Sequence, residues 1–393
     1  MKLFYFLIYL YLILKPYYFW ESGTLQIGDM FLVLAFGLFL LFSLRKKSII
    51  NENVKKNKYY AYFLIMVIII NFIYYFTNND KTFMISSLYY IFNFIIIVLF
   101  SFLLDDYKFI NGMNKIMKIN LIIQLFLCVF GIGKQWKGTF RYSGTFNDPN
   151  QFSYFILISY CYIYIFAQKF ECKNNIFLYL IISLYLIIRS SSTGMLLGIF
   201  VFIILELLNN FRNLPIFLKK NTKKIFISIY FISLIVIILE LYFMINPNKK
   251  DNLMNNFKDI KIFKRITEKI NKTENEKDND LWRDRGYDII FASPSYLIYG
   301  AGQGGYGRSI PIIGHGGEIH ATFPSILFYY GFFPTIVLIY WIYLKLKKID
   351  LDVLIVYIAL LAESFTLLNQ RQALFWIIIL LGNNIKMKKG YKK

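Results

Sequence analysis

Long apolar segments alternate with short polar connections along most of the chain. A helix needs about 20 mostly apolar residues to cross the hydrocarbon core of a bilayer. Twelve segments reach or approach this length, and the seventh, eighth and twelfth are short. The pattern therefore predicts an all-α polytopic membrane protein with 11 or 12 transmembrane helices. The expected spans are 3–20, 26–44, 59–77, 83–104, 119–135, 151–168, 176–189, 193–208, 225–246, 321–344, 351–367 and 372–385.

Composition agrees with a membrane protein. Of the 393 residues, 57% are hydrophobic and only 17% are charged, which is more apolar surface than a soluble domain of this size can bury. The net charge of +21 raises the possibility of nucleic-acid binding, but Lys and Arg gather in short segments between the apolar runs. We therefore expect membrane lipids, not nucleic acid, as partners. The three cysteines show no disulfide or metal-ligand spacing, and we expect no metal.

The distribution of basic residues predicts the orientation of the chain. With the N-terminus inside, the cytoplasmic segments hold 25 Lys and Arg residues, whereas the short outer and intramembrane positions hold 7. The positive-inside rule then places both termini in the cytoplasm. The chain divides into spans one to nine (1–246), a large outer loop (247–320), and three final spans with a basic cytoplasmic tail (321–393).

The outer loop contains two features of its own. Residues 252–272 carry apolar side chains at helical spacing with Lys and Asn opposite, which indicates an amphipathic helix on the membrane surface or a plain solvated helix. Residues 300–307, GAGQGGYG, form a glycine-dense turn that could let backbone approach a phosphorylated ligand. The turn lacks the Gly-Lys-Ser/Thr ending of a Walker A loop, so we do not expect a nucleotide site.

Several arginines lie outside or at the outer ends of spans, where the positive-inside bias opposes them. An arginine in such a place indicates a function, and its planar guanidinium suits bidentate binding of phosphate. These residues are Arg141, Arg189, Arg283, Arg285, Arg308 and Arg371.

His320 is one of two histidines and lies at the expected N-terminus of the tenth span. Positive charge at a helix N-terminus disfavours imidazolium, so we expect a neutral ring that can act as a general base. Gly331 follows eleven residues later, close to three helical turns, which predicts that both residues share one helix face. Glu318 is placed to orient the ring or to bind a sugar hydroxyl. The alternative is a histidine that only caps the helix.

Four motifs resemble elements of one family, the O-antigen polymerase and O-antigen ligase superfamily of membrane glycosyltransferases. Residues 320–331, HATFPSILFYYG, resemble its His-x10-Gly element, and 140–155, FRYSGTFNDPNQFSYF, resemble its Arg-x-x-Gly-x-x-x-x-Pro-Asn motif. Residues 190–200, SSSTGMLLGIF, are similar to its Ser/Thr-Arg-Gly-Leu-Leu element, with Thr193 where an arginine is often found. Residues 293–307, SPSYLIYGAGQGGYG, are similar to its Pro-Leu-x-Gly-x-Gly stretch.

This resemblance implies a GT-C-like fold and a metal-independent, inverting glycosyltransferase that needs no cofactor. The donor would be an undecaprenyl-pyrophosphate-linked oligosaccharide, used on the outer face of the bacterial cytoplasmic (inner) membrane. His320 would be the catalytic base, and Arg141 the first pyrophosphate-binding arginine. The second would be Arg283 or Arg285, since the local spacing does not choose between them. Further expected site residues are Arg371, also for pyrophosphate, and Glu318, Asn150 and Gly331 in supporting or acceptor-binding roles.

Three functions remain open on the sequence. The leading one is a repeat-unit polymerase for O-antigen or capsule, which adds the growing glycan to the non-reducing end of a lipid-linked repeat. It would work beside a chain-length regulator and a flippase. The second is a ligase that passes finished glycan to the lipid A core. The third is a lipid-linked oligosaccharide flippase, which would need charged or broken helices at the bilayer midplane; Glu363 lies inside an expected span.

Overall fold

The computed structural model describes residues 2–21, 25–44, 47–136, 141–170, 175–212, 283, 285–314, 316–347 and 349–384. The chain divides into two compact units, one formed by Met1–Val201 with Trp282–Lys393 and the other by Phe202–Leu281. The second unit contributes only residues 202–212 of one helix to the described part. The architecture below is therefore that of the first unit.

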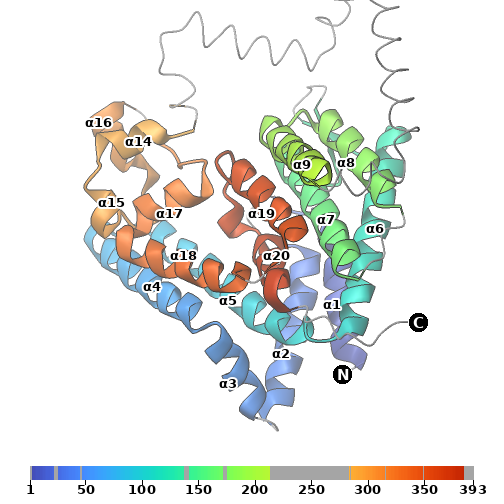
Figure 1. Ribbon diagram of the computed structural model, residues 1–393. Coiled ribbons are helices and arrows are strands. Elements are labelled where there is room, and N and C mark those ends of the chain that lie inside the picture. Colours follow the sequence, from blue (N-terminus) through green and yellow to red (C-terminus); the bar gives the residue numbers. More distant parts are fainter. Residues whose placement is uncertain are drawn as a thin grey trace, which may run out of the picture. The chain divides into compact units, whose positions relative to one another are not determined.

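Helices dominate the described residues (Figure 1). One short antiparallel pair, β1 (Lys134–Gln135) and β2 (Tyr142–Gly144), precedes α7. The helices are α1 (Lys2–Leu14), α2 (Ile27–Leu44), α3 (Lys47–Lys56), α4 (Lys58–Asn78), α5 (Thr82–Leu103), α6 (Tyr107–Val129), α7 (Pro149–Lys169), α8 (Ile176–Ser190), α9 (Thr193–Arg212), α14 (Tyr287–Ala292), α15 (Tyr296–Tyr299), η1 (Tyr306–Ser309), α16 (Ile310–Ile313), α17 (Thr322–Tyr330), α18 (Phe332–Leu346), α19 (Leu351–Ser364), η2 (Asn369–Arg371) and α20 (Ala373–Asn384).

Each expected span inside the described residues overlaps one of these helices. Among the described residues, α4, α5 and α6 are long and apolar enough to cross a membrane, and α1, α2, α8, α9, α18 and α20 are shorter apolar helices. The helical, apolar architecture fits an all-α membrane protein, and the number of spans stays a prediction. The expected span 225–246 and the expected amphipathic helix 252–272 lie outside the described residues.

The start of α6 differs from the expected boundary for a local reason. The sequence suggested a span from 119, because Lys108, Lys115 and Lys118 make the preceding stretch polar. The helix instead begins at Tyr107, where the Asp106 side chain accepts a hydrogen bond from the backbone amide of Lys108 at 2.8 Å. This N-cap satisfies one of the free amides of the first turn, so the helix extends through the basic segment.

The expected tenth span is two helices, α17 and α18, separated at Gly331. Gly331 adopts φ 77° and ψ −178°, a conformation that is almost restricted to glycine. A side chain there would also collide with the backbone carbonyl of Ile298 on the neighbouring segment. His320 precedes α17, whose N-cap is Ala321. The prediction that His320 and Gly331 share one helix face is therefore wrong, because neither residue lies within the helix between them.

Helices that are neighbours in sequence pack as pairs, namely α1 with α2, α4 with α5, and α7 with α8. The C-terminal helices close the core, with α18 against α4 and α20 against α5 and α7. Buried aromatic rings fill the junction: the Tyr60 ring centroid lies 5.2 Å from that of Trp341 and 5.1 Å from that of Trp376. Such edge contacts add specificity to apolar burial.

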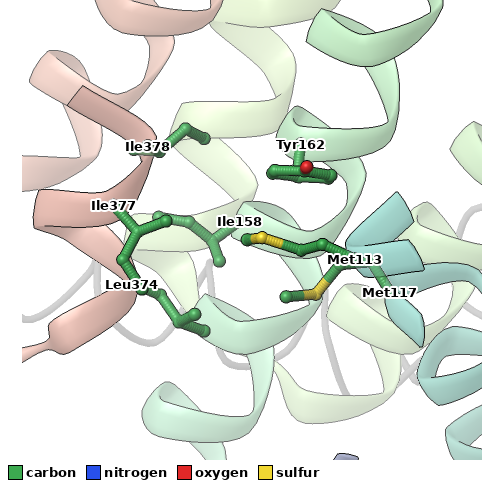
Figure 2. Close-up of a pocket in the computed structure, with 7 residues that line it drawn as sticks. All are labelled: Met113, Met117, Ile158, Tyr162, Leu374, Ile377 and Ile378. Carbon is green, nitrogen blue, oxygen red and sulfur yellow. The ribbon is translucent and has the colours of Figure 1, made fainter. Parts of the chain in front are cut away.

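A narrow apolar crevice lies between α6, α7 and α20 (Figure 2). Its lining is almost wholly hydrocarbon and thioether, and the hydroxyl of Tyr162 donates to the Ile110 carbonyl oxygen. Such a lining offers no cation to a diphosphate, so the candidate site lies elsewhere. The lining residues are Met113, Met117, Ile158, Tyr162, Leu374, Ile377 and Ile378.

Candidate functional site

Arg141 and Asn150, the first and last residues of the Arg-x-x-Gly-x-x-x-x-Pro-Asn motif, are in direct contact. Arg141 donates from Nη2 to Asn150 Oδ1 at 3.0 Å and from Nε to the Ser190 carbonyl oxygen at 3.1 Å. Ser192 Oγ donates to the same Asn150 oxygen at 2.9 Å. Asn150 is held at the start of α7 because the Asp148 side chain caps the helix and accepts from the Asn150 amide. The motif thus ties α7 to the turn between α8 and α9.

The turn between α8 and α9 approaches the segment after α19 very closely. Ser191 occupies the left-handed region, with φ 51°, and α9 begins two residues later at Thr193. A Cβ atom on Gly194 would overlap Thr366 Oγ1, so only glycine allows this approach. The start of α9, directly after the turn that bonds Arg141, therefore lies beside the residues that follow α19.

Arg285 occupies the space between Thr366 and His320. Its guanidinium donates to the Thr366 carbonyl oxygen, and its own carbonyl accepts from the His320 backbone amide at 2.9 Å. Gly286 follows with φ 69°, and a Cβ atom there would lie 2.8 Å from the Glu318 carbonyl oxygen. Arg283 is exposed. Of the two arginines that the sequence left open, Arg285 is the one that lies against His320.

The His320 side chain reaches solvent, while its backbone is fixed between the buried residues Ile319 and Ala321. The pKa of its imidazole is lowered, first by the protein atoms packed around it and then by the positive charges of Arg285 and Arg371; the charge of Glu318 acts in the opposite direction. The direction agrees with the expected neutral ring. The pKa is lowered by partial desolvation and two guanidinium groups. The sequence had suggested a different cause, the charge at the helix N-terminus.

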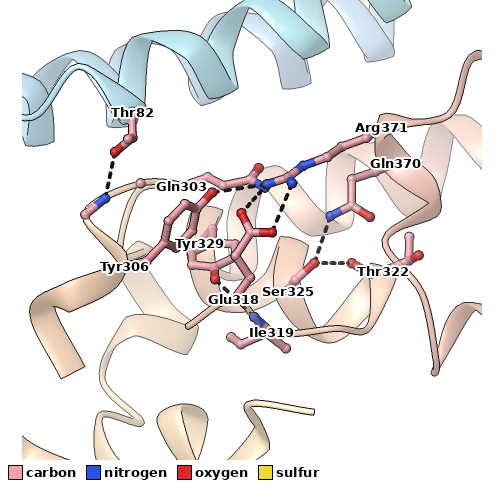
Figure 3. Close-up of polar contacts among 12 residues, drawn as sticks. Thr82, Gln303, Tyr306, Glu318, Ile319, Thr322, Ser325, Tyr329, Gln370 and Arg371 are labelled. Atoms are coloured by element: carbon pink, nitrogen blue, oxygen red, sulfur yellow. Dashed lines mark hydrogen bonds and ion pairs between the residues drawn. The ribbon is translucent and has the colours of Figure 1, made fainter. Parts of the chain in front are cut away.

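Arg371 and Glu318 form a bidentate ion pair (Figure 3). Arg371 Nη1 lies 3.0 Å from Glu318 Oε2, and Nη2 lies 2.5 Å from Oε1. Nη2 also donates to the Tyr306 hydroxyl at 3.1 Å. Burial alone would raise the pKa of Glu318, but the hydrogen bonds and charge of Arg371 outweigh it and hold that pKa below its usual range. The carboxylate is thus ionised and paired two residues from His320.

The corner that carries Arg371 is fixed to α17 and α5 by buried hydrogen bonds. The Asn369 amide donates to Thr322 Oγ1 at 2.9 Å, and Gln370 Nε2 donates to Ser325 Oγ at 2.9 Å. The Gln370 carbonyl oxygen accepts from Asn93 of α5 at 2.6 Å. Arg371 also lies over the Tyr89 ring, 5.5 Å from its centroid. The guanidinium is therefore rigidly placed at the N-terminal side of α17.

Arg308 and the glycine-dense turn are occupied by structural contacts. The Arg308 guanidinium donates to the carbonyl oxygens of Gly302, Gly304 and Gly305, and lies 4.9 Å from the Phe83 ring centroid. The Gly305 amide donates to Thr82 Oγ1 at 2.9 Å (Figure 3). The turn packs on α5 through these contacts, and on α4 through the Tyr74 hydroxyl, which donates to the Gly300 carbonyl oxygen. A phosphate-binding role for it gains no support.

Hydrogen bonds join His320 to Arg285, Glu318 to Arg371 and Arg141 to Asn150. Arg283 is exposed, and Gly331 is the break between α17 and α18. Tyr306, which contacts Arg371, lies in the glycine-dense turn, and Thr366, which contacts Arg285, lies in no motif; neither was predicted as a site residue. His315 lies outside the described residues. Within the described part of the chain, no group of three or more His, Cys, Asp and Glu side chains is arranged to hold a metal ion.

Comparison of the chain with models of protein families found no match, and comparison with curated proteins found none. Function is therefore inferred from the geometry of these residues and from the resemblance of the motifs.

Proposed function

We propose that this protein is a repeat-unit polymerase of a bacterial surface polysaccharide. It would transfer the growing glycan from undecaprenyl pyrophosphate to a hydroxyl at the non-reducing end of a lipid-linked repeat, on the outer face of the cytoplasmic membrane. The observation that carries the proposal is the contact between His320 and Arg285, with the Arg371–Glu318 pair beside it. A base next to several guanidinium groups suits displacement of a diphosphate.

The proposed reaction is a single displacement. The neutral His320 ring accepts the proton of the acceptor hydroxyl, and the oxygen of that hydroxyl attacks the anomeric carbon of the donor sugar. The bond between this carbon and the diphosphate oxygen breaks, and its electron pair leaves with the diphosphate. Attack from the face opposite the leaving group inverts the configuration. His320 then holds the proton as imidazolium until solvent takes it.

Arginines stabilise the charge that develops on the leaving diphosphate. Arg285 is the better assignment for the second family arginine than Arg283, because it contacts both Thr366 and the His320 backbone. Arg141 bonds the end of α8 at Ser190, and the following turn leads to Gly194, which closely approaches Thr366. Planar guanidinium groups bind phosphate oxygens in pairs, so lysine would serve poorly at these positions.

A deletion strain tests the proposal and separates it from its alternatives. Loss of the polymerase leaves a single repeat on each surface glycan. Loss of a ligase instead leaves unsubstituted acceptor while lipid-linked polymer accumulates. Loss of a flippase leaves lipid-linked repeats on the inner face. An unchanged ladder of surface polysaccharide in the deletion strain would contradict all three functions.

A further inference from the structure

The Glu318 carboxylate lies on the Arg371 guanidinium as a bound anion would. Both terminal nitrogens of Arg371 meet the two oxygens of one carboxylate, at 3.0 Å and 2.5 Å. Two oxygens of a phosphate group would take the same positions on a guanidinium fork. The paired side chains keep 25% and 21% of their surface exposed. An anion from solvent can therefore reach them.

The two partners differ in how firmly they are held. Arg371 lies in η2, between the Asn369 backbone bonds and the Tyr89 ring, and its Nε is buried without a hydrogen-bond partner. Glu318 lies in the extended stretch before α17, directly after Gly316 and Gly317. Its carboxylate also accepts a hydrogen bond from the Tyr306 hydroxyl, and it leaves both partners when it rotates about side-chain bonds. Exchange would therefore move the carboxylate and leave the guanidinium in place.

A displaced Glu318 carboxylate has a second cationic partner nearby. His320 is two residues away, and the two side chains already interact through their charges. Among the described residues, the other charged groups that act on the imidazole are Arg285 and Arg371, both positive. When the ring accepts a proton during the reaction, it becomes a third positive charge beside Arg285 and Arg371. A carboxylate released from Arg371 would then offset that new charge.

From this arrangement we infer that Glu318 occupies the diphosphate position on Arg371 in the empty protein, and that donor binding displaces it toward His320. The inference rests on the proposed function and assigns Glu318 as a positioning residue. A diphosphate carries more negative charge than one carboxylate, so it binds the guanidinium more tightly and displaces the carboxylate. The base therefore gains its counter-charge only when a donor is in place.

Binding of inorganic pyrophosphate to the purified full-length protein in detergent tests this exchange by calorimetry. Glu318→Gln keeps the shape of the side chain but removes the competing charge, so we expect about tenfold tighter binding, as for loss of a charge-assisted pair. Glu318→Ala should change affinity in the same direction. Glu318→Asp retains the charge and should stay closer to wild type. Arg371→Gln should abolish the gain in a Glu318→Gln background.

Kinetics with a lipid-linked donor give a second readout. Glu318→Gln should lower KM for the donor and also lower kcat, because the imidazolium has lost its counter-charge. A merely structural ion pair predicts the opposite for binding, since a disordered Arg371 would weaken pyrophosphate affinity and raise KM. Equal or weaker pyrophosphate binding by both Glu318→Gln and Glu318→Ala would overturn the exchange. That result would leave the polymerase proposal intact. Failure of the wild-type protein to extend glycan would instead overturn the polymerase proposal, and with it the donor-driven step of this exchange.

Discussion

The backbone amide of His320 donates to the carbonyl oxygen of Arg285 at 2.9 Å, although the glycine-dense turn separates the two residues in sequence. This bond brings a titratable ring beside a guanidinium that is itself anchored on Thr366. Under the proposed function, these two residues are the general base and a phosphate-binding cation.

The two neighbouring arginines form a matched pair for mutation. Arg285→Ala should abolish polymer formation at normal protein levels, because the cation beside His320 is lost. Arg283→Ala should retain most activity, since this side chain is exposed and makes no comparable contact in the described residues. Length profiles of surface polysaccharide from complemented deletion strains measure both. Loss of polymer with Arg283→Ala and not with Arg285→Ala would reverse the assignment.

Arg141 should be as sensitive to charge geometry as to charge. Arg141→Ala should remove polymer, and Arg141→Lys should also perform poorly, because an ammonium cannot bond Asn150 and the Ser190 carbonyl in the same fork. Immunoblots of membranes control for protein level. Full-length polysaccharide in Arg141→Ala cells would rule out the proposed role.

The activity of the wild-type enzyme should depend on the protonation of His320. The base works only as neutral imidazole, so activity should fall on acidification. Because partial desolvation and two guanidinium groups lower the pKa of His320, the fall should occur below the ordinary value of about 6.5. Initial rates of glycan extension at low donor concentration, where they report the free protein, measure the midpoint over about two pH units on either side of this value. A midpoint above the ordinary value would show that Glu318 dominates the ring's environment.

Gly331 should be required for folding and not for chemistry. Gly331→Ala forces a Cβ atom into the Ile298 carbonyl at φ 77°, which should destabilise the protein by roughly 1–3 kcal/mol. Gly317→Ala is the matched control, because nothing lies within 4 Å of the added atom. Thermal unfolding in detergent compares the variants. Equal stability of the two would remove the steric explanation of the helix break.

The topology can be tested apart from the chemistry. Reporter fusions after Lys224 and Lys348 should report the cytoplasm, and fusions near Asp278 should report the outside, because basic residues favour the cytoplasmic connections 25 to 7. A cytoplasmic signal at Asp278 would place the proposed site on the wrong face for a lipid-linked donor.

Apolar runs located most helices because a long hydrophobic segment has few alternatives to a helix in a membrane. The break at Gly331 was not predictable from hydropathy, since FYYGFFPTI contains no charged residue. The Ile298 carbonyl, distant in sequence, approaches Gly331 so closely that it leaves no room for a side chain there. The start of α6 was predicted too late because its lysines lower the hydropathy of the first turns, although Asp106 caps a helix there. Motifs identified His320 and Arg141, but the choice of Arg285, the Arg371–Glu318 pair and the role of Tyr306 depend on tertiary contacts that no local pattern encodes.

The central claim is that His320 acts as the base of glycan transfer, and extension of a lipid-linked repeat by purified enzyme tests it most directly. General base catalysis contributes about 10²–10⁴-fold, so His320→Ala should lose activity by that factor while folding normally and while His315→Ala stays close to wild type. Wild-type extension rates in His320→Ala, or an equal loss in His315→Ala, would contradict the account.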